Sequence, residues 1–277
     1  MTTLTLTLHA ASREALASAE TRLAEVTGEA GADPAALGSE LLAVVDLLGK
    51  EIGLRRAVAD ASSDPGARTR LVRTLLTGKV SEQALRVLDA VVAARWSSPR
   101  ELVDGVESLG RNALLTSAEK AGQLDAVEDQ LFRIARIVVS NPELEQTLSD
   151  QTAPGEAKRR LVRELLQSKV DDVTLALVEQ VVGRSAGRGV GFNLDQLVRL
   201  AAQRRERSVA YVTSASELSA EQRERLAEQL HRIYGRPIGL HVEVDHRLGG
   251  GLVVRVGDEV IDGSTAGRIA ELRRQLA

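Results

Sequence analysis

The side chains in this sequence that are best suited to bind a metal are His241, Glu243, Asp245 and His246. Zinc sites in proteins use three or four such ligands, usually together with cysteine or further histidines. Here the first three alternate along one stretch, and no cysteine or third histidine lies nearby. Alternate residues of a β-strand face the same side, so this pattern favours a solvated strand face over a metal site by about twenty to one.

A glycine-rich passage, GRSAGRGVGF, contains Gly187, Gly189 and Gly191 and is the best candidate for a phosphate-binding loop. Such loops have the order G-x-x-x-x-G-K-[ST] and join a strand to a helix, and the passage has neither feature. The passage therefore favours a flexible linker over a nucleotide-binding loop. The basic run Gln203–Ser208 could contact phosphates, but a chain so poor in aromatic residues favours a solvated helix end or a protein contact by about five to one.

No constellation of residues typical of catalysis is visible. The sequence has no cysteine and therefore no thiol nucleophile, and no serine lies in a G-x-S-x-G elbow. No pair of carboxylates lies within an apolar run where burial would raise a pKa. We therefore expect a protein that has no catalytic activity of its own and that needs neither a cofactor nor a metal.

The composition is typical of a globular protein built from helices. The chain has 277 residues, of which 43% are hydrophobic, 27% are charged and 2% are aromatic. A core with so few aromatic residues is made from Leu, Val, Ile and Ala, which suits packed helices better than a β-sandwich. The net charge of -3 provides no overall basic field for nucleic acid. No apolar run reaches the eighteen or so residues that span a bilayer, and the N-terminus lacks the basic region of a secretory signal.

An internal duplication is visible in the first two thirds of the chain. The segment Leu71–Arg95 aligns without gaps to Leu161–Ser185, with ten identities in twenty-five positions. Apolar residues also match at helical spacing. Leu85, Leu88, Val91 and Val92 of the first copy match Leu175, Val178, Val181 and Val182 of the second. Two copies are too few for a solenoid, so the repeat predicts a pair of helical bundles that bury the same face.

Local start and stop signals predict where the helices lie. Asp64 followed by Pro65 is a helix start, and Ser81 and the matching Asp171 are both expected to cap helices. Pro142 should end the helix before it, because the residue preceding a proline is displaced from the helical region. Other helices are expected over about residues 12–26, 36–48, 99–121, 125–140 and 194–207.

The last quarter of the chain predicts a small α+β domain. The run VAYVTSAS alternates as a strand, and Ser219 with Gln222 forms a capping box for the next helix. The segment Ile238–Val244 alternates again, and its even-numbered positions form one buried face. A strand, a helix and a second strand in that order predict a crossover within a mixed sheet.

A β-hairpin is predicted close to the C-terminus. The β-rich runs Leu252–Val256 and Glu259–Asp262 flank Gly257 and Asp258, and such a two-residue connection suits a type I′ or II′ turn. Ser264 is expected to cap a final helix with an apolar stripe. That stripe consists of Ile269, Leu272 and Leu276.

The order and spacing of this C-terminal pattern resemble the delta subunit family of bacterial F-type ATP synthases, which is related to the mitochondrial oligomycin-sensitivity-conferring protein. The residues that match the family signature are Asp245, Leu248, Gly250, Gly251, Gly257, Asp258, Asp262, Gly263, Ser264 and Arg268. Gly249 and Ala266 depart from it, because the family usually has a bulky aliphatic and a basic residue there. Residues 109–148 also resemble the start of an ordinary delta subunit, so the resemblance covers about Leu102 to the end. The first hundred residues are then an extra helical copy, as in the long actinobacterial members of the family.

The resemblance implies a mainly α fold, in which duplicated N-terminal helical bundles precede a small α+β C-terminal domain. The expected division is an extra helical unit at 1–100, a delta-type bundle at 101–190, a linker and basic helix at 191–208, and the α+β domain at 209–277. The candidate groove for a partner helix consists of Leu109, Ala113, Leu114, Leu175, Val178 and Val182.

The resemblance also implies a function. The protein would be a non-catalytic connector in the peripheral stalk of a proton-translocating ATP synthase. It would bind the N-terminal helices of the alpha subunit of the catalytic head and the C-terminal end of the membrane-anchored b subunit, and nucleic acid would not be a partner. It would lie at the cytoplasmic face of the cell membrane, attached only through the complex. The alternative is a helical adaptor or a nucleic-acid-associated protein without catalytic activity, which a steep loss of affinity with added salt would reveal.

Overall fold

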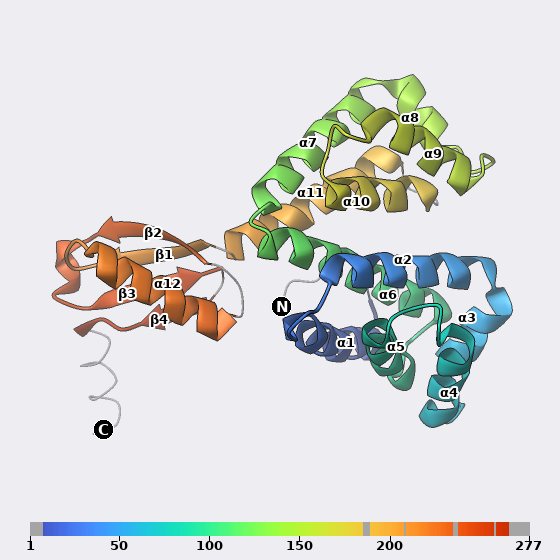
Figure 1. Ribbon diagram of the computed structural model, residues 1–277, viewed down its shortest axis with the longest axis horizontal. Coiled ribbons are helices and arrows are strands. Elements are labelled where there is room, and N and C mark those ends of the chain that lie inside the picture. The colour runs from blue at the N-terminus through green and yellow to red at the C-terminus, as the bar shows by residue number, and fades with distance from the viewer. Residues whose placement is uncertain (1–7, 185–188, 208, 235–237, 258, 266–277) are drawn as a thin grey trace. The chain divides into compact units, whose positions relative to one another are not determined.

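The computed structural model describes residues 8–184, 189–207, 209–234, 238–257 and 259–265. Helices dominate these residues, and the strands form one small sheet near the C-terminal end (Figure 1). The mainly α fold class with a small α+β C-terminal region is therefore confirmed. The chain divides into two compact units, which are residues 1–121 with 126–198 and residues 122–125 with 199–277.

The first helical copy consists of six helices. They are α1 Ala10–Gly28, α2 Pro34–Lys50, α3 Ile52–Ala59, α4 Pro65–Leu76, α5 Glu82–Ala93 and α6 Pro99–Lys120. Their starts follow the local signals: the side chain of Asp64 accepts a hydrogen bond from Ala67 N, and Ser81 Oγ accepts one from Ala84 N. Such caps satisfy N–H groups that the first turn of a helix leaves without a partner.

The second copy repeats this arrangement. Its helices are α7 Leu124–Ser140, α8 Pro142–Ser149, α9 Gly155–Leu166 and α10 Asp172–Gly183, and α11 Val190–Arg207 follows. Each of α7 to α10 begins and ends ninety residues after its counterpart among α2 to α5. The duplication predicted from sequence is thus confirmed at the level of helix boundaries, and α7 ends directly before Asn141 and Pro142 as expected.

One capping prediction is wrong. Asp171 precedes α10 as Ser81 precedes α5, but its side chain makes no cap. Instead, Asp171 Oδ2 accepts a hydrogen bond from Gln130 Nε2 of α7 at 2.8 Å, and Gln130 Oε1 accepts from Asp171 N at 3.0 Å. A long amide side chain from a neighbouring helix has displaced the local interaction, which sequence spacing alone does not reveal.

The core of the first copy is aliphatic and closely packed. Trp96 is 3% exposed, donates a hydrogen bond from Nε1 to Val91 O at 2.8 Å, and lies directly on Gly105 of α6, where an added Cβ would collide with the indole ring. The helices α2 and α6 also approach closely, because a Cβ at Gly38 would lie 2.8 Å from Gly110 O. Two glycines therefore permit a helix spacing that larger residues would prevent.

Helix α6 contributes to the core of the first copy and also contacts the second. Its Leu102 and Leu109 are fully buried among the side chains of the first copy, while other residues of α6 contact α10. The sequence placed α6 at the start of the second bundle, where it lies next to α7 in the chain. In the structure it is also the sixth helix of the first bundle.

The second unit contains the sheet. The strands are β1 Val209–Ser214, β2 Gly239–Val244, β3 Leu252–Val256 and β4 Glu259–Asp262, in the order β2-β1-β3-β4. β1 and β2 are parallel neighbours, and α12 Ala220–Tyr234 connects them. The capping box that begins α12 is confirmed, because Ser219 N donates to Gln222 Oε1 and Gln222 N donates to Ser219 Oγ. Helix α12 covers one face of the sheet through Leu226 and Leu230.

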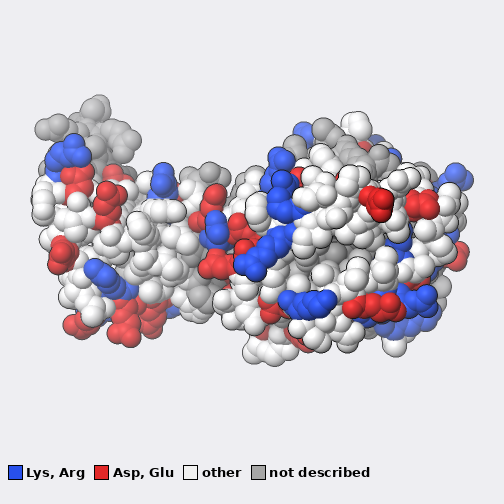
Figure 2. All heavy atoms as spheres, turned by 90° about the horizontal axis from the view of Figure 1, so that it is seen from above, with Lys and Arg blue, Asp and Glu red and all other residues white. Residues whose placement is uncertain are grey.

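Charged side chains of both signs are interspersed over the face of the molecule in Figure 2, with no large area of one sign. Within the described residues, no group of three or more His, Asp or Glu side chains is arranged to hold a metal ion. His241 and Glu243 lie on the exposed side of β2, as the alternation predicted. Among the same residues, no helix has both the length and the apolar character needed to cross a bilayer.

Candidate functional site

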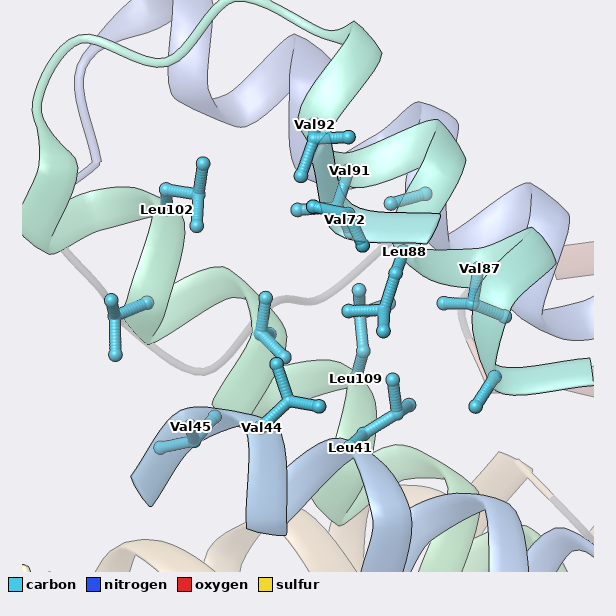
Figure 3. Close-up of a cluster of buried hydrophobic side chains, with 14 of the residues drawn as sticks. Leu41, Val44, Val45, Val72, Val87, Leu88, Val91, Val92, Leu102 and Leu109 are labelled. Atoms are coloured by element: carbon cyan, nitrogen blue, oxygen red, sulfur yellow. The ribbon is translucent and has the colours of Figure 1, made fainter. Parts of the chain in front are cut away.

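The most distinctive site in the helical unit is an apolar pocket between α2, α3, α4, α5 and α6 of the first copy. Every residue that lines it is aliphatic. The lining residues are Val44, Leu47, Leu48, Leu54, Val58, Val72, Leu75, Leu76, Leu88, Val91, Val92, Leu102 and Val106. Figure 3 shows how Val44, Val72, Leu88 and Leu102 converge from four different helices on the floor of this region.

The rim of the pocket is open to solvent. Leu75 of α4 is 37% exposed, and Leu47 of α2 and Leu54 of α3 are partly exposed, whereas Val91 and Val92 below them are buried. A pocket with aliphatic walls and no polar group offers nothing to hydrogen-bond a substrate or to perform a reaction. Its exposed edge, formed by Leu75 with Leu47 and Leu54, offers an apolar surface of the kind on which an amphipathic helix of another protein can pack.

The second copy carries the same residue types at the same places. Each lining residue that α2 to α5 contribute has an aliphatic residue ninety positions later, and we call this set the matching apolar face. Its members are Ile134, Ile137, Val138, Leu144, Leu148, Val162, Leu165, Leu166, Val178, Val181 and Val182. The repetition covers the exposed rim as well as the buried floor, although a solvated rim position does not need an aliphatic residue for folding.

The matching apolar face is more exposed than the pocket. Ile137 is 54% exposed and Leu165 is 46% exposed, against 37% for Leu75. Exposed aliphatic residues that lie singly are common on protein surfaces, but exposed residues above an apolar floor, repeated in two copies, are typical of an interaction site. The helical unit therefore has two related apolar surfaces, which are candidates for binding partners.

The groove residues expected from sequence lie deeper than this rim. Leu109 and Ala113 of α6 are fully buried, Leu114 is 1% exposed, and Val178 and Val182 of α10 are at most 2% exposed. The remaining member, Leu175, is partly exposed. Three of them lie on α6 and three on α10, which are in contact. Their role in binding a partner helix stays a prediction, since most of their side-chain surface already contacts the chain itself.

The rim residues were missed because a helical stripe identifies the core and not its edge. Leu47, Leu54 and Leu75 look like ordinary core positions in their own helices. The available signal was the repeat: Leu75 and Leu165 occupy matching positions that both turn out to be exposed. A residue that folding does not require but that both copies carry is a candidate for function.

Polar side chains join the two copies within the helical unit. Arg159 of α9 forms an ion pair with Asp46 of α2, with Nη1 2.7 Å from Oδ2. Arg111 of α6 donates from Nε to Gln180 Oε1 of α10 at 2.9 Å, and Gln180 Nε2 donates to Glu107 Oε1 at 2.7 Å. Arg111 also pairs with Glu107 on its own helix. We call these residues, with Asp104 and Arg184, the joint between the copies.

Burial changes the pKa values of two charged side chains in the joint. Burial, and then the neighbouring Glu107 carboxylate, raise the pKa of Asp104 above its usual range, although Arg184 and Arg100 act in the opposite direction. Burial also lowers the pKa of Arg111. Charges removed from water need their partners, so removing one member leaves another uncompensated. The joint consequently holds α9 and α10 against α2 and α6 in one orientation.

The signature glycines of the C-terminal unit have a structural reason. Gly251 has φ of +79°, and an added Cβ would collide with Gly263 O, because the beginning of β3 and the end of β4 pass very close together. Gly250 O accepts a hydrogen bond from Thr265 N, and Asp262 Oδ1 accepts one from Ser264 N.

The rest of the signature also supports this hairpin. Gly257 has the positive φ of +58° expected for the turn, and the side chain of Asp245 accepts from Arg247 N in the 3₁₀ turn His246–Leu248. Asp258, Arg268 and the predicted final helix with Ile269, Leu272 and Leu276 lie outside the described residues.

The face of the sheet opposite α12 is exposed and carries an aromatic and cationic row. Tyr211 of β1 is 43% exposed, its ring lies 5.5 Å from that of His241 on β2, and Arg255 of β3 lies 5.3 Å above it. The strand register continues the row to Val260 of β4, which is 58% exposed. Tyrosine and arginine are enriched where proteins bind each other, so this face is a third candidate docking surface.

Comparison with known proteins identifies the family of the chain. The family model described as ATP synthase delta (OSCP) subunit matches residues 111–276, from the middle of α6 into the C-terminal unit. The chain belongs to the ATP synthase delta (OSCP) subunit family. The family resemblance inferred from the signature residues is thereby confirmed, and the match begins near the point where the sequence pattern suggested.

The alignments with relatives in this family span nearly the whole chain, including the segment that forms the first helical copy. The chain is 50% identical over 271 residues to the ATP synthase subunit delta of Nocardia farcinica, covering 98% of this chain and 100% of that one. It is 46% identical to the ATP synthase subunit delta of Rhodococcus opacus, and the match covers 98% of this chain and 99% of that one. It is 43% identical to the ATP synthase subunit delta of Streptomyces griseus, and the match covers 98% of this chain and 100% of that one. A chain in the cryo-EM structure of the Toxoplasma gondii mitochondrial ATP synthase hexamer is 22% identical to this chain, with a TM-score of 0.31. The match covers 60% of this chain and 94% of that one.

Proposed function

We propose that this delta-family chain is the connector of the peripheral stalk in a proton-translocating F-type ATP synthase. It links the alpha subunits of the catalytic head to the membrane-anchored b subunit, so that the head does not rotate with the rotor during ATP synthesis. It performs no chemistry itself. It lies at the cytoplasmic face of the cell membrane and is attached there only through the complex.

The observation that carries this proposal is the duplicated apolar surface. The pocket of the first copy and the matching apolar face of the second share their aliphatic positions, including the exposed pair Leu75 and Leu165. A link that resists torque needs slow dissociation, and two docking surfaces on one body provide this better than one, because release then requires both contacts to open together. Helices of the alpha subunit are the proposed occupants of these surfaces.

The second end of the link is assigned to the C-terminal unit. Its open sheet face presents Tyr211, His241, Arg255 and Val260 in one row, and we assign this face to the C-terminal end of the b subunit. The proposal uses the division into 1–100, 101–190, 191–208 and 209–277, and it assigns the extra copy at 1–100 to the head. The two helical segments bind the head, and the last segment binds b.

The proposal is tested by placing a charge on each apolar rim. Leu75→Asp, Leu165→Asp and the double variant are added to delta-depleted catalytic heads of the alpha, beta and gamma subunits, and release of the chain is followed after dilution. Loss of a buried leucine is worth about 1.5–3 kcal/mol, so we expect roughly tenfold faster release for Leu165→Asp and more for the double variant.

Thr74→Asp is the matched control, because Thr74 is exposed and lies next to Leu75 on the same helix. It adds the same charge without removing an apolar contact, and we expect it to release at the rate of the unchanged chain. Unchanged release of the double variant, with its helix content intact by circular dichroism, would sink the proposal for the helical unit. Tyr211→Ala tests the other end in the same way, with binding to the purified soluble part of the b subunit as the readout.

A further inference from the structure

A network of polar side chains connects the two helical copies. Gln180 of α10 is 5% exposed, and its amide group accepts a hydrogen bond from Arg111 Nε of α6 at 2.9 Å and donates one to Glu107 Oε1 at 2.7 Å. Beside it, Arg184 Nη1 lies 3.3 Å from Glu107 Oε2. Hydrogen bonds of charged groups are short and directional. They therefore define how α10 lies on α6, which also belongs to the core of the first copy.

A second connection lies between α9 and α2. Arg159 and Asp46 form a bidentate ion pair, with Nη1 2.7 Å from Oδ2 and Nη2 2.8 Å from Oδ1. Arg159 Nε also donates to Glu179 O of α10 at 3.4 Å, so the guanidinium group is oriented by both copies. A bidentate pair restricts orientation as well as distance. The second copy is therefore attached to the first at two places, on α6 and on α2.

The fold of a single copy does not require these polar residues. Helices α4 and α5 have the same boundaries as α9 and α10, ninety residues earlier, but carry short side chains at the corresponding positions. The residues that match Arg159, Gln180 and Arg184 are Thr69, Ala90 and Ala94. On the receiving side, the residue that matches Asp46 is Arg136, which has the opposite charge. The joint is thus specific to the contact between the two copies.

A gain in stability is a weak explanation for the joint. Gln180 and Arg111 are removed from water, and their hydrogen bonds mainly replace those that water would supply. Burial also lowers the pKa of Arg111, because the charged form is costly to keep away from solvent. An apolar contact of the same volume is often as stable. A polar network adds a defined geometry, because only one arrangement pairs all of its groups.

The joint lies on the same helices as the two apolar surfaces. Asp46 directly precedes Leu47 of α2, which belongs to the exposed edge of the pocket. Arg159 lies on α9, the helix that carries Leu165 of the matching apolar face. Any rotation of α9 relative to α2 therefore moves Leu165 relative to Leu47. The joint sets the placement of one apolar surface relative to the other.

We propose that the joint fixes the distance and orientation between the exposed edge of the pocket and the matching apolar face, so that both surfaces bind the catalytic head at the same time. Its residues are positioning residues, because they act through the two surfaces. A second contact adds to the first only when the geometry permits both, and a preorganised geometry avoids the entropy cost of ordering the copies on binding. The inference rests on the proposed connector function and adds to it a requirement for a fixed placement of the two contacts.

The first test measures the orientation of the copies in the free, full-length chain. The joint is broken by the double variant Arg159→Leu, Gln180→Leu, which leaves both apolar surfaces intact. The sequence has no cysteine, so nitroxide spin labels can be attached at Thr74→Cys and Glu164→Cys, which are matching exposed positions on α4 and α9. Double electron–electron resonance should give one narrow distance distribution with the joint intact and a clearly broader one in the double variant. Equal widths would overturn the inference.

The second test measures release from delta-depleted catalytic heads after dilution. The double variant should be released roughly tenfold faster, because the second contact loses effective concentration. In a chain that also carries Leu165→Asp, it should add less than about twofold, because placement matters only while both contacts form. A general loss of stability would instead act equally in both backgrounds. Circular dichroism and the thermal midpoint verify that each variant is folded.

Arg163→Gln is the matched control. Arg163 lies one turn after Arg159 on α9 and pairs with Glu179 of its own copy at 2.6 Å, so its loss should leave both the distance distribution and the release unchanged. Equal acceleration by the joint variant in both backgrounds overturns the inference. If Leu165→Asp accelerates release and the joint variant does not, the connector function stands and the inference is wrong. If neither variant changes release, both proposals fail together.

Discussion

The two helical copies have nearly the same helices, and their surfaces differ around α2 and α7. Helix boundaries from α2 to α5 recur ninety residues later without a shift, and the buried floor positions stay aliphatic. Leu42 is nevertheless 8% exposed, whereas its match Phe132 is 50% exposed. The residues that the two copies share therefore preserve the helices and the core. A few residue differences between the copies change which side chains are exposed to solvent.

A pair of glycines between two helices of the first copy has no counterpart in the second copy. In the first copy Gly38 and Gly110 let α2 and α6 approach closely, and Leu42 fits against Gly110. The residue that matches Gly38 is Glu128, and α11 has no glycine beyond Gly191 in its first turn. The second copy therefore has no such glycine pair, and Phe132, which matches Leu42, is 50% exposed.

The largest effect is expected at Trp96, which only the first copy possesses. The matching position, 186, is alanine in the sequence. Trp96→Ala removes a ring that is 3% exposed and that packs on Gly105, so we expect a loss of about 3–5 kcal/mol in the free energy of unfolding. Urea denaturation followed by circular dichroism measures it. Trp96→Phe should recover part of the loss, and a loss below about 1 kcal/mol for Trp96→Ala would contradict the tight core of the first copy.

The glycine contact between α2 and α6 gives the next largest effect. Gly38→Ala places a methyl group 2.8 Å from Gly110 O, and overpacking of this kind costs about 1–3 kcal/mol. Gly49→Ala on the same helix is the matched control, because a Cβ there meets nothing within 4 Å and should stabilise the helix by about 0.5–1 kcal/mol. Thermal midpoints of the two variants should move in opposite directions. A shift in the same direction would remove the glycines as the reason for the difference between the copies.

The joint between the copies is tested by a double-mutant cycle on Asp46 and Arg159. Their side chains are 25% and 16% exposed, so the screened pair should couple by about 1 kcal/mol. Arg163 and Glu179, which pair within the second copy at 2.6 Å, provide the comparison. Coupling at Asp46 and Arg159 that is indistinguishable from zero would mean that the copies are not held together through this pair.

The smallest effect concerns a turn that both copies share. The pKa of Asp60 is lowered by hydrogen bonds that its carboxylate accepts, the larger effect coming from the Ser62 hydroxyl and the next from the Ser62 backbone N–H. The pKa of Asp150 is lowered in the same way, first by the backbone N–H of Thr152 and next by the Thr152 hydroxyl. A carboxyl group with a depressed pKa stabilises the fold above its ordinary pKa of about 3.9, and this contribution is lost as the pH falls through the depressed value.

In the unchanged chain, protonation of these carboxyl groups contributes to the fall of the thermal midpoint at low pH. Asp60→Asn and Asp150→Asn should therefore each make this fall slightly smaller, and by similar amounts. The midpoint is measured between about pH 6 and pH 2, where these carboxyl groups take up protons. Both positions are fully exposed to solvent, so the effect is small. If only one of the two substitutions changed the acid limb, the turns would not be equivalent, and the comparison between the copies would be limited to their helices.

Local residue signals were sufficient to predict most of the secondary structure. Asp64 with Pro65, Ser81, the capping box at Ser219 and the hairpin around Gly257 all act through hydrogen bonds or φ preferences within a few residues. Asp171 shows the limit of this approach. Its capping group is bound by Gln130 from a helix forty-one residues away, and no local pattern contains that information.

The sequence by itself determined the family, the duplication, the order of helices and strands, and the C-terminal signature, because each depends on residue type and spacing along the chain. Only the tertiary structure decided which aliphatic residues form a rim and which a floor, that α6 packs into the core of the first copy, and that both phenylalanines are exposed. Exposure depends on how closely neighbouring helices approach. That distance is set by contacts such as Gly38 against Gly110, between residues far apart in the chain.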